Sequence, residues 1–466
     1  MESSKDMQRR QKIGKSYPDN EAVKLQEYQG VPSISLTRTK TGLYDRKCQL
    51  LEEILAKDNM LNALRKVEAN KGAPGIDGME VSSLRKHLKE EWCYIKSALL
   101  SGTYKPIPVR EAKIPKPDGG VRTLGIPAAI DRMIQQAISQ KLTPIFDIEF
   151  SENSYGFRPG RSAHQAVLKA KEYIEEGYRW VVDIDIERFF DRVNHDMLMA
   201  RVARKVADKR VLKLIRAYLN TGVMADGVVV EKYEGTPQGG PLSPLLSNIL
   251  LDDLDRELEK RGHRFCRYAD DCNIYLKSER AAERTHSSMV RFIEEKLKLK
   301  VNRIKSAVDK ADRRKFLGYS YYTSREGTVR LRLGPGVAKR QKDKIRQITK
   351  RSRSRSLDIV ISEINKAMIG FINYFKLADM KMFLVELEKW IRRKLRVIIW
   401  KQWKNCKTRF RKLVGMGLSP EQATIANSRR IYWRVSKTPQ VSGVMGIAFF
   451  RDKGLINLVE RYGLIR

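Results

Sequence analysis

The chain has 466 residues, of which 42% are hydrophobic and 8% are aromatic, so it can form a sizeable core and is not a basic disordered tail. Its net charge of +37 would be self-repelling without an anionic partner, and nucleic acid fits better than a membrane surface because the basic residues are spread along the whole chain. Five cysteines without C-x-x-C spacing disfavour a disulfide framework and a zinc ribbon, and no apolar run approaches the ~20 residues that span a membrane.

The first part of the chain mixes helical and strand patterns. Residues 1–48 are polar, with scattered proline and glycine, and we predict an N-terminal extension there. Apolar residues recur with helical spacing over 50–67, and a glycine- and proline-rich loop follows over Lys71–Gly78. The segment 114–124 has the pattern of two short strands around a Gly-Gly turn, and 128–142 has a helical pattern. Helices and strands continue to mix until about residue 330.

From Gly334 onward the pattern is helical and strongly basic. Residues 335–420 contain 23 lysines and arginines but only six acidic residues. Two apolar stripes with helical spacing run over 361–375 and 391–403, and basic residues occupy other positions of the second segment. A solvated helix face is the simplest interpretation, but at this charge density we favour a groove that binds nucleic acid.

The segment 179–186 predicts a strand with one apolar and one acidic face. Side chains alternate along a strand, so Trp180 and the apolar residues at every second position after it share one face. Val181, Asp183 and Asp185 share the other face. We therefore expect a core face and a working face, with Asp185 near the end of the strand, where its carboxylate can reach a cleft.

A second acidic motif follows some 85 residues later. Short hydrophobic strands flank Asp270 and Asp271, which predicts a hairpin with both carboxylates at its tip. Adjacent carboxylates repel each other, and Mg²⁺, which prefers one or two carboxylates together with substrate phosphates, would remove that repulsion. An Asp-Asp pair alone is more often a solvated turn, and Asp185 alone is more often a cap or a surface acid. Tyr-x-Asp-Asp in an apolar hairpin, after Asp-x-x-x-Phe-Phe, is far more specific and predicts a metal site.

These motifs resemble those of the reverse transcriptases encoded by bacterial group II introns, which are also called maturases. The resemblance runs from about Leu50 to the C-terminus in ordered blocks, namely Gly72–Gly78, Ile114–Pro127, Tyr155–Ser162, Asp185–Asp191, Gly235–Asn248, Tyr268–Asp271, Lys305–Ser306 and Phe316–Tyr319. It implies an α+β fold of the right-hand polymerase type, with fingers and a palm built on an antiparallel sheet over 49–334. An α-helical thumb or maturase domain over 335–420 and a small basic DNA-binding region over 421–466 would follow.

The resemblance also implies which residues hold the metal ions. In this family the acid of Asp-x-x-x-Phe-Phe and the first acid of Tyr-x-Asp-Asp bind two Mg²⁺ ions, which here gives Asp185 and Asp270. Asp271 would be adjacent and secondary, and the backbone carbonyl of Ile186 would be a further ligand. Two such ions can activate a 3′-hydroxyl and stabilise the leaving pyrophosphate. We interpret Asp183 as structural.

The deoxynucleoside triphosphate substrate would be bound by residues from several blocks. By resemblance, Phe190 packs under the incoming sugar and excludes a 2′-hydroxyl, although core packing is its simpler role. Lys116 and Arg122 would grip the triphosphate, with Arg122 able to bind it bidentately. Gln238 would line the nucleotide pocket near the templating base. Lys305 resembles a lysine that can donate a proton to pyrophosphate, and a solvated lysine is nearly as plausible.

Contacts with the longer nucleic acid would come from three further regions. The loop Lys71–Gly78 resembles a fingers insertion that contacts the template backbone, where glycine permits close approach of a phosphate. The helix over 391–403 would bind intron RNA through four basic residues, while its apolar stripe keeps it folded. These four are Arg392, Arg393, Arg396 and Lys401. Residues 432–439 and 454–462 resemble the DNA-binding tail of the family.

The sequence thus predicts an RNA-directed DNA polymerase that assists splicing and retrohoming by target-primed reverse transcription. Its partners would be group II intron RNA, target DNA, and an RNA template with a DNA primer, in the bacterial cytosol or nucleoid and without a membrane. No paired-cysteine and His-Asn-His cluster precedes Arg466, so we expect no second-strand nicking, as in the group IIC lineage. The alternatives are a host-adopted relative in DNA repair or phage defence, and an RNA-binding splicing factor without polymerase activity, against which the intact acids argue.

Overall fold

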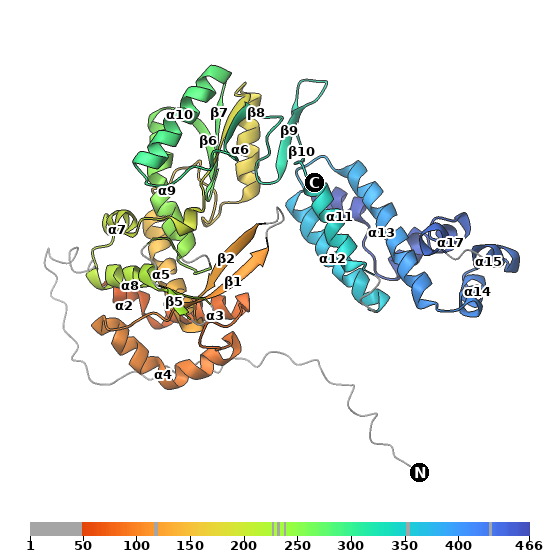
Figure 1. Ribbon diagram of the computed structural model, residues 1–466, viewed down its shortest axis with the longest axis horizontal. Coiled ribbons are helices and arrows are strands. Elements are labelled where there is room, and N and C mark those ends of the chain that lie inside the picture. The colour runs from red at the N-terminus through yellow and green to blue at the C-terminus, as the bar shows by residue number, and fades with distance from the viewer. Residues whose placement is uncertain are drawn as a thin grey trace, which may run out of the picture. The chain divides into compact units, whose positions relative to one another are not determined.

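The computed structural model describes residues 49–115, 120–225, 228–230, 234–236, 239–350, 355–427 and 431–466. The predicted extension over 1–48 lies outside these residues. The chain divides into two compact units. The first contains residues up to Ser151 together with Ile186–Leu254 and Phe292–Lys300, and the second contains Glu152–Asp185, Asp255–Arg291 and Val301–Arg466. Figure 1 labels many of the elements of each unit.

The first unit combines helices with a small sheet. Its sheet has the order β2-β1-β4-β5, with β1 antiparallel to β2 and parallel to β4. The strands are β1 (Val109–Pro115), β2 (Val121–Ile126), β4 (Val223–Ala225) and β5 (Val228–Val230). The helices are α2 (Leu50–Ile54), α3 (Lys57–Asn70), α4 (Val81–Ser101), α5 (Ala129–Asp147), α7 (His195–Ala203) and α8 (Lys209–Asn220). The predicted pair of strands around the Gly-Gly turn is confirmed as β1 and β2.

The helix predicted over 50–67 is instead two helices. α2 ends at Ile54, and Ala56 is extended before α3 begins. The side-chain amide of Asn59 donates to the carbonyl oxygens of Ile54, at 2.7 Å, and of Ala137 in α5, at 3.1 Å. These bonds satisfy a carbonyl that the break leaves without a helical partner and join the break to α5. Apolar spacing continues across the break, so the periodicity of the sequence does not reveal it.

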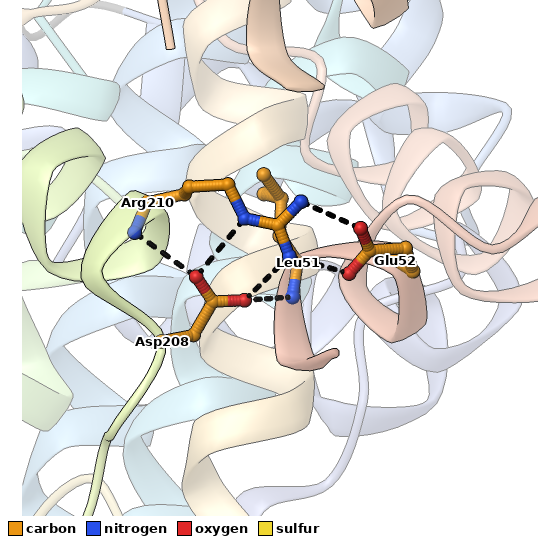
Figure 2. Close-up of polar contacts among 4 residues, drawn as sticks. All are labelled: Leu51, Glu52, Asp208 and Arg210. Atoms are coloured by element: carbon orange, nitrogen blue, oxygen red, sulfur yellow. Dashed lines mark hydrogen bonds and ion pairs between the residues drawn. The ribbon is translucent and has the colours of Figure 1, made fainter. Parts of the chain in front are cut away.

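A polar cluster joins α2 to α8 (Figure 2). The buried carboxylate of Asp208 accepts hydrogen bonds from the backbone amides of Arg210, at 2.9 Å, and of Leu51, at 3.1 Å. The guanidinium of Arg210 also binds Asp208 and makes two bonds to Glu52, of 2.6 and 2.7 Å. Burial raises the pKa of Asp208, but these donors outweigh burial and hold the pKa below its usual value. The cluster therefore caps one helix and fixes the start of another.

The second unit contains an antiparallel sheet of order β6-β7-β3-β8. Its strands are β3 (Trp180–Asp185), β6 (Arg264–Tyr268), β7 (Asp271–Leu276) and β8 (Ala307–Lys310). Helix α6 (Ala163–Glu175) begins with a capping box between Ser162 and Gln165 and packs against β6. A hairpin of β9 (Tyr319–Thr323) and β10 (Val329–Leu333) follows. Two long helices, α9 (Ser243–Lys260) and α10 (Glu279–Glu295), are divided between the units.

The rest of the second unit is helical, as the sequence predicts. Buried residues from Val337 to Tyr462 form one continuous hydrophobic core. The long helices of this part are α11 (Val337–Ile348), α12 (Leu357–Tyr374) and α13 (Lys381–Gln402). Shorter ones are α14 (Cys406–Val414), α15 (Pro420–Asn427), α16 (Tyr432–Val435), α17 (Pro439–Val444), α18 (Ile447–Asp452) and α19 (Leu458–Ile465). None of the helices described has the length and apolar character needed to cross a bilayer.

Candidate active site

Two neighbouring strands bring the acidic motifs together. β3 and β7 pair antiparallel, with Asp185 directly opposite Asp271 and Asp183 opposite Asn273. Directly opposed residues lie on one face of the sheet with their Cβ atoms ~4.5–5.5 Å apart. Val182 and Ile184 are buried on the other face, as predicted. At the other end of the acidic face, Val181 is buried in a second hydrophobic cluster.

The predicted hairpin at Asp270 and Asp271 is present. Tyr268 at the end of β6 pairs with Asp271 at the start of β7, so that Ala269 and Asp270 form a two-residue turn. Ala269 has a φ of +59°, in the left-handed region that disfavours residues with a Cβ atom by about 1–2 kcal/mol. Neighbouring structure must therefore hold this turn in its conformation.

Like charge and burial raise the pKa values of the acids on this face. Burial, together with repulsion from the nearby Asp183, Asp270 and Asp185, raises the pKa of Asp271 to about 8. Burial also raises the pKa of Asp185, opposed by the Lys305 ammonium, whose Nζ lies 3.7 Å from Asp185 Oδ2. Asp183 forms an ion pair with Arg314. Mutual repulsion among these acids is thus one cause of the raised pKa values of Asp271 and Asp185.

This donor set fits divalent cations as a partial site. In the part of the chain that the structure describes, no group of three or more His, Cys, Asp or Glu residues could hold a metal alone. Mg²⁺ takes one or two protein carboxylates and completes its shell with water and substrate phosphates, so the facing pair Asp185 and Asp271 offers the kind of ligand that it uses. The Lys305 ammonium already places one positive charge beside Asp185. The carboxylates thus lie where a cation is stabilised electrostatically.

The backbone after β3 is fixed by a segment over 301–306. The Asp185 amide donates to the Ser306 hydroxyl at 3.0 Å, and the Asp185 carbonyl accepts from the Asn302 amide at 2.8 Å. Lys305 lies between these two residues, with a side chain that is 56% exposed. The sequence block Lys305–Ser306 therefore has two effects: it positions the end of β3, and it places Lys305 beside Asp185.

Of the predicted nucleotide-binding residues in the first unit, Phe190 is the one whose side chain is described. It lies in a short 3₁₀ helix (η1, Phe189–Asp191), half-buried, and packs edge-on against Phe189 with ring centroids 5.2 Å apart. Its carbonyl accepts a hydrogen bond from the Thr236 amide at 2.6 Å. Lys116 and Gln238 lie outside the described residues, as does the side chain of Arg122, whose backbone belongs to β2.

The sequence did not indicate a role for His195, which lies beside the segments that contain Phe190 and Gly235. His195 is buried, with Nε2 2.6 Å from the Gly235 carbonyl oxygen and Nδ1 3.1 Å from Asn220 Oδ1. Gly235 has a φ of +92°, and a Cβ atom there would lie 2.8 Å from the Phe190 carbonyl oxygen. His195 therefore holds the segment before Gln238 against the Phe190 turn. No local signal marks this histidine, because its partners come from other parts of the chain.

The four basic residues predicted to bind RNA on α13 differ in their surroundings. Arg396 donates to the carbonyl oxygens of Met445, Ser436 and Ser442 at 3.0, 3.2 and 3.4 Å, and burial lowers its pKa to about 10. Arg392 forms a 3.3 Å ion pair with Glu388, and both side chains are only 13% exposed.

Arg393 and Lys401 have other surroundings. The guanidinium of Arg393 lies over the ring of Trp433, 3.4 Å from its centroid, and Lys401 is exposed. The expectation that all four lie on an open surface is thus too simple, because Arg392 is paired within α13 and Arg396 joins α13 to carbonyl groups of the segment that follows.

Comparison with known proteins agrees with the geometry. Residues 114–321 match the family described as reverse transcriptase (RNA-dependent DNA polymerase), and residues 338–414 match the group II intron maturase-specific domain. Protein YkfC of Escherichia coli (strain K12) is 34% identical over 300 residues, which cover 56% of this chain and 79% of that protein. The group II intron-encoded protein LtrA of Lactococcus lactis subsp. cremoris is 29% identical over 434 residues, covering 71% of each chain.

A solved structure titled "Partial Cas6-RT-Cas1--Cas2 complex" is 27% identical, with a TM-score of 0.35, and the match covers 53% of this chain and 43% of that one. The polymerase motifs therefore lie within the match to the reverse transcriptase family, and the basic helical region lies within the match to the maturase-specific domain. The chain belongs to the group II intron family of reverse transcriptases with a maturase domain.

Proposed function

We propose that this reverse transcriptase adds deoxynucleotides by a two-metal mechanism at Asp185 and Asp270, with Asp271 adjacent. The observation that supports this most is the pairing of Asp185 with Asp271 across β3 and β7, beside a turn that contains Asp270. The raised pKa of Asp271, caused by burial and by the neighbouring acids, supports a site that binds cations. When bound, two Mg²⁺ ions would lower the pKa of the primer 3′-hydroxyl and stabilise the leaving pyrophosphate. The Ile186 carbonyl is a further proposed ligand.

The chain's own residues would bind the substrate and move the last proton. Lys305, exposed and beside Asp185, is the proposed donor of a proton to pyrophosphate. The Phe190 ring would lie under the incoming sugar and exclude a 2′-hydroxyl. Lys116 and Arg122 are proposed to bind the triphosphate, and Gln238 to lie near the templating base.

Substitution of Asp270 tests the metal assignment. Asp270→Ala should abolish cDNA synthesis in a primer-extension assay and leave RNA affinity in a filter-binding assay almost unchanged. Asp309→Ala is a matched control, because Asp309 lies on β8 of the same sheet, opposite Val181, and should affect neither assay. Extension by Asp270→Ala at ordinary Mg²⁺ concentrations would remove Asp270 from the site.

A smaller side chain tests the proposed role of Phe190. Phe190→Val should raise the ratio of ribonucleotide to deoxynucleotide incorporation, because space opens beside the 2′ carbon. Gel assays with ribonucleotides alone should then show longer products. An unchanged ratio, with normal deoxynucleotide incorporation, would leave Phe190 with a packing role only.

We also propose that the loop Lys71–Gly78 contacts the template backbone together with Arg132 of α5. Arg132 is only 9% exposed, yet Nε and Nη2 have no hydrogen-bond partner among the residues described. Its guanidinium lies so close to Gly72 that a Cβ atom there would be 2.2 Å from Nη1. Buried guanidinium nitrogens without an acceptor favour a phosphate group nearby. Arg132→Met should weaken template binding by roughly tenfold and Arg132→Lys by less; equal affinity for wild type and Arg132→Met would refute this contact.

The maturase domain is proposed to bind structured group II intron RNA, for splicing and for target-primed reverse transcription into DNA. We assign RNA contacts first to exposed basic residues of α11, and then to the exposed Lys401 and to Arg393 on α13. The α11 residues are Lys339, Arg340 and Lys344. Each phosphate contact contributes about 0.7–0.9 to the log–log slope of affinity against salt.

A salt titration tests this surface. Replacing the three α11 residues with alanine should lower the slope by roughly two to three on intron RNA and impair assisted splicing, while extension of a short primer–template suffers less. Neutralising all four α13 residues should also lower the slope, but thermal unfolding must be measured in parallel, because Arg396 binds three carbonyl groups. Identical slopes for the α11 variant and wild type would place the RNA-binding surface elsewhere.

A further inference from the structure

A fully buried ion pair lies directly behind the Ala269–Asp270 turn. Arg267 of β6 and Asp255 of α9 are both 0% exposed. Arg267 Nε and Nη2 donate to the two oxygens of Asp255 at 2.7 and 2.6 Å, which makes a bidentate pair. Neither residue is an expected metal ligand or nucleotide contact.

Further bonds of Arg267 connect the pair to the turn. Arg267 Nη1 donates to the carbonyl oxygen of Ala269 at 2.9 Å, and Nη2 donates to the Ser154 hydroxyl at 2.8 Å. The Arg267 backbone pairs with Asn153 and Tyr155, each at 2.9 Å. The Ala269 carbonyl belongs to the peptide group that leads into Asp270. The guanidinium therefore fixes the orientation of that peptide, at the residue with a φ of +59°.

Energetics favour an orienting role over a stabilising one. Removing two charges from water costs several kcal/mol per ion, and replacing a buried pair with apolar residues is often neutral or stabilising. A planar guanidinium can bind Asp255 with two bonds and still reach the Ser154 hydroxyl and the Ala269 carbonyl, whereas a lysine ammonium is a single point donor. We propose that Arg267, held by Asp255, is a positioning residue that sets the backbone of the Ala269–Asp270 turn for metal binding.

This inference rests on the proposed metal-binding role of Asp270, and its test separates the two. The main variant is Arg267→Met with Asp255→Leu, which leaves no unpaired charge. The second variant is Arg267→Lys, which keeps the charge and is available if the double variant does not fold. The matched control is Arg201→Met with Asp253→Leu, because Arg201 and Asp253 form a similar 2.6 Å pair in the first unit.

Three measurements on the full-length protein distinguish positioning from simple structural support. Thermal unfolding reports folding, electron paramagnetic resonance reports Mn²⁺ binding to the protein with primer–template, and single-turnover extension reports the rate. We expect the main variant to remain folded, to bind Mn²⁺ at least tenfold more weakly and to extend about 10²-fold more slowly, with partial recovery at high Mn²⁺. Arg267→Lys should show the same defects to a smaller extent, and the control pair neither.

Two outcomes overturn the inference. In the first, a folded main variant or Arg267→Lys binds Mn²⁺ and extends primers as wild type does, while Asp270→Ala remains inactive; this refutes the role of Arg267 but not that of Asp270. In the second, the variant loses activity only in proportion to the folded protein that it loses, as measured by thermal unfolding, and the protein that stays folded binds Mn²⁺ with normal affinity. If Asp270→Ala itself retains Mn²⁺ affinity and extension, the proposed function fails instead.

Discussion

A single methyl group at Gly156 should slow the polymerase by moving its acidic turn. A Cβ atom added to Gly156 would lie 2.2 Å from the Ala269 amide nitrogen, 2.9 Å from the Tyr268 carbonyl carbon and 3.1 Å from Ala269 Cα. All three are backbone atoms, so no side chain can rotate away. Ordinary contact begins near 3.4 Å, so the turn must move by about 1 Å.

The size of the effect follows from this displacement. Overpacking costs about 1–3 kcal/mol of stability, which the folded protein can tolerate, whereas a 1 Å misplacement at a catalytic site lowers the rate by about 10²-fold. Single-turnover primer extension at saturating deoxynucleotide measures the rate, and thermal unfolding measures the stability. Gly370→Ala is the control, because Gly370 lies within α12 with open space around it and should leave extension unchanged. A Gly156→Ala protein that extends at the wild-type rate would refute the assignment of this turn to catalysis.

Three further substitutions test the structure around the site. Asp208→Ala should speed hydrogen exchange at the Leu51 amide by roughly 10- to 100-fold, because a buried donor without its acceptor costs about 1–3 kcal/mol, while Asp208→Asn should change it less. Burial raises the pKa of Asp131 to about 6, so ionisation of this carboxyl opposes folding. As the pH rises from about 4 to 7, the melting temperature of wild type should therefore fall relative to that of Asp131→Asn. A difference in melting temperature that stays constant over this pH range would contradict the prediction. Arg396→Gln should lower the melting temperature and leave extension of a short primer–template intact, and an unchanged melting temperature would mean that its three carbonyl contacts contribute little.

The acidic strand and the hairpin could be predicted because their signals are local. Alternation along 179–186 identifies the buried face of β3, and two apolar strands around Asp270 identify the hairpin. Resemblance to a family then adds that these distant motifs meet, which the register of Asp185 with Asp271 confirms. The same local reasoning placed Val181 with the acids. It is buried because a second hydrophobic cluster covers that end of the strand.

The surroundings of individual charged residues could not be predicted. A helical pattern indicates which residues of α13 are polar, but Arg396 takes its acceptors from carbonyl groups 40 to 49 positions later in the chain. Arg267 likewise depends on Asp255 and on Ser154, 113 residues away. The sequence does not indicate which backbone carbonyl groups are free to accept a hydrogen bond from a side chain. It therefore could not separate arginines that bind RNA from arginines that hold helices together.

Three basic residues near the acids differ in their exposure to solvent, and this difference indicates which of them a metal ion can displace. Arg267 is fully buried and bonded to backbone and Asp255, so it fixes geometry. Arg314 is 25% exposed and paired with Asp183, which it can neutralise permanently. Lys305 is 56% exposed and lies 3.7 Å from Asp185, too far for a strong hydrogen bond and in a position from which a long side chain can withdraw at little cost. The cation beside Asp185 is therefore the displaceable one, and Asp185 is the acid that a metal ion can bind without breaking a buried pair.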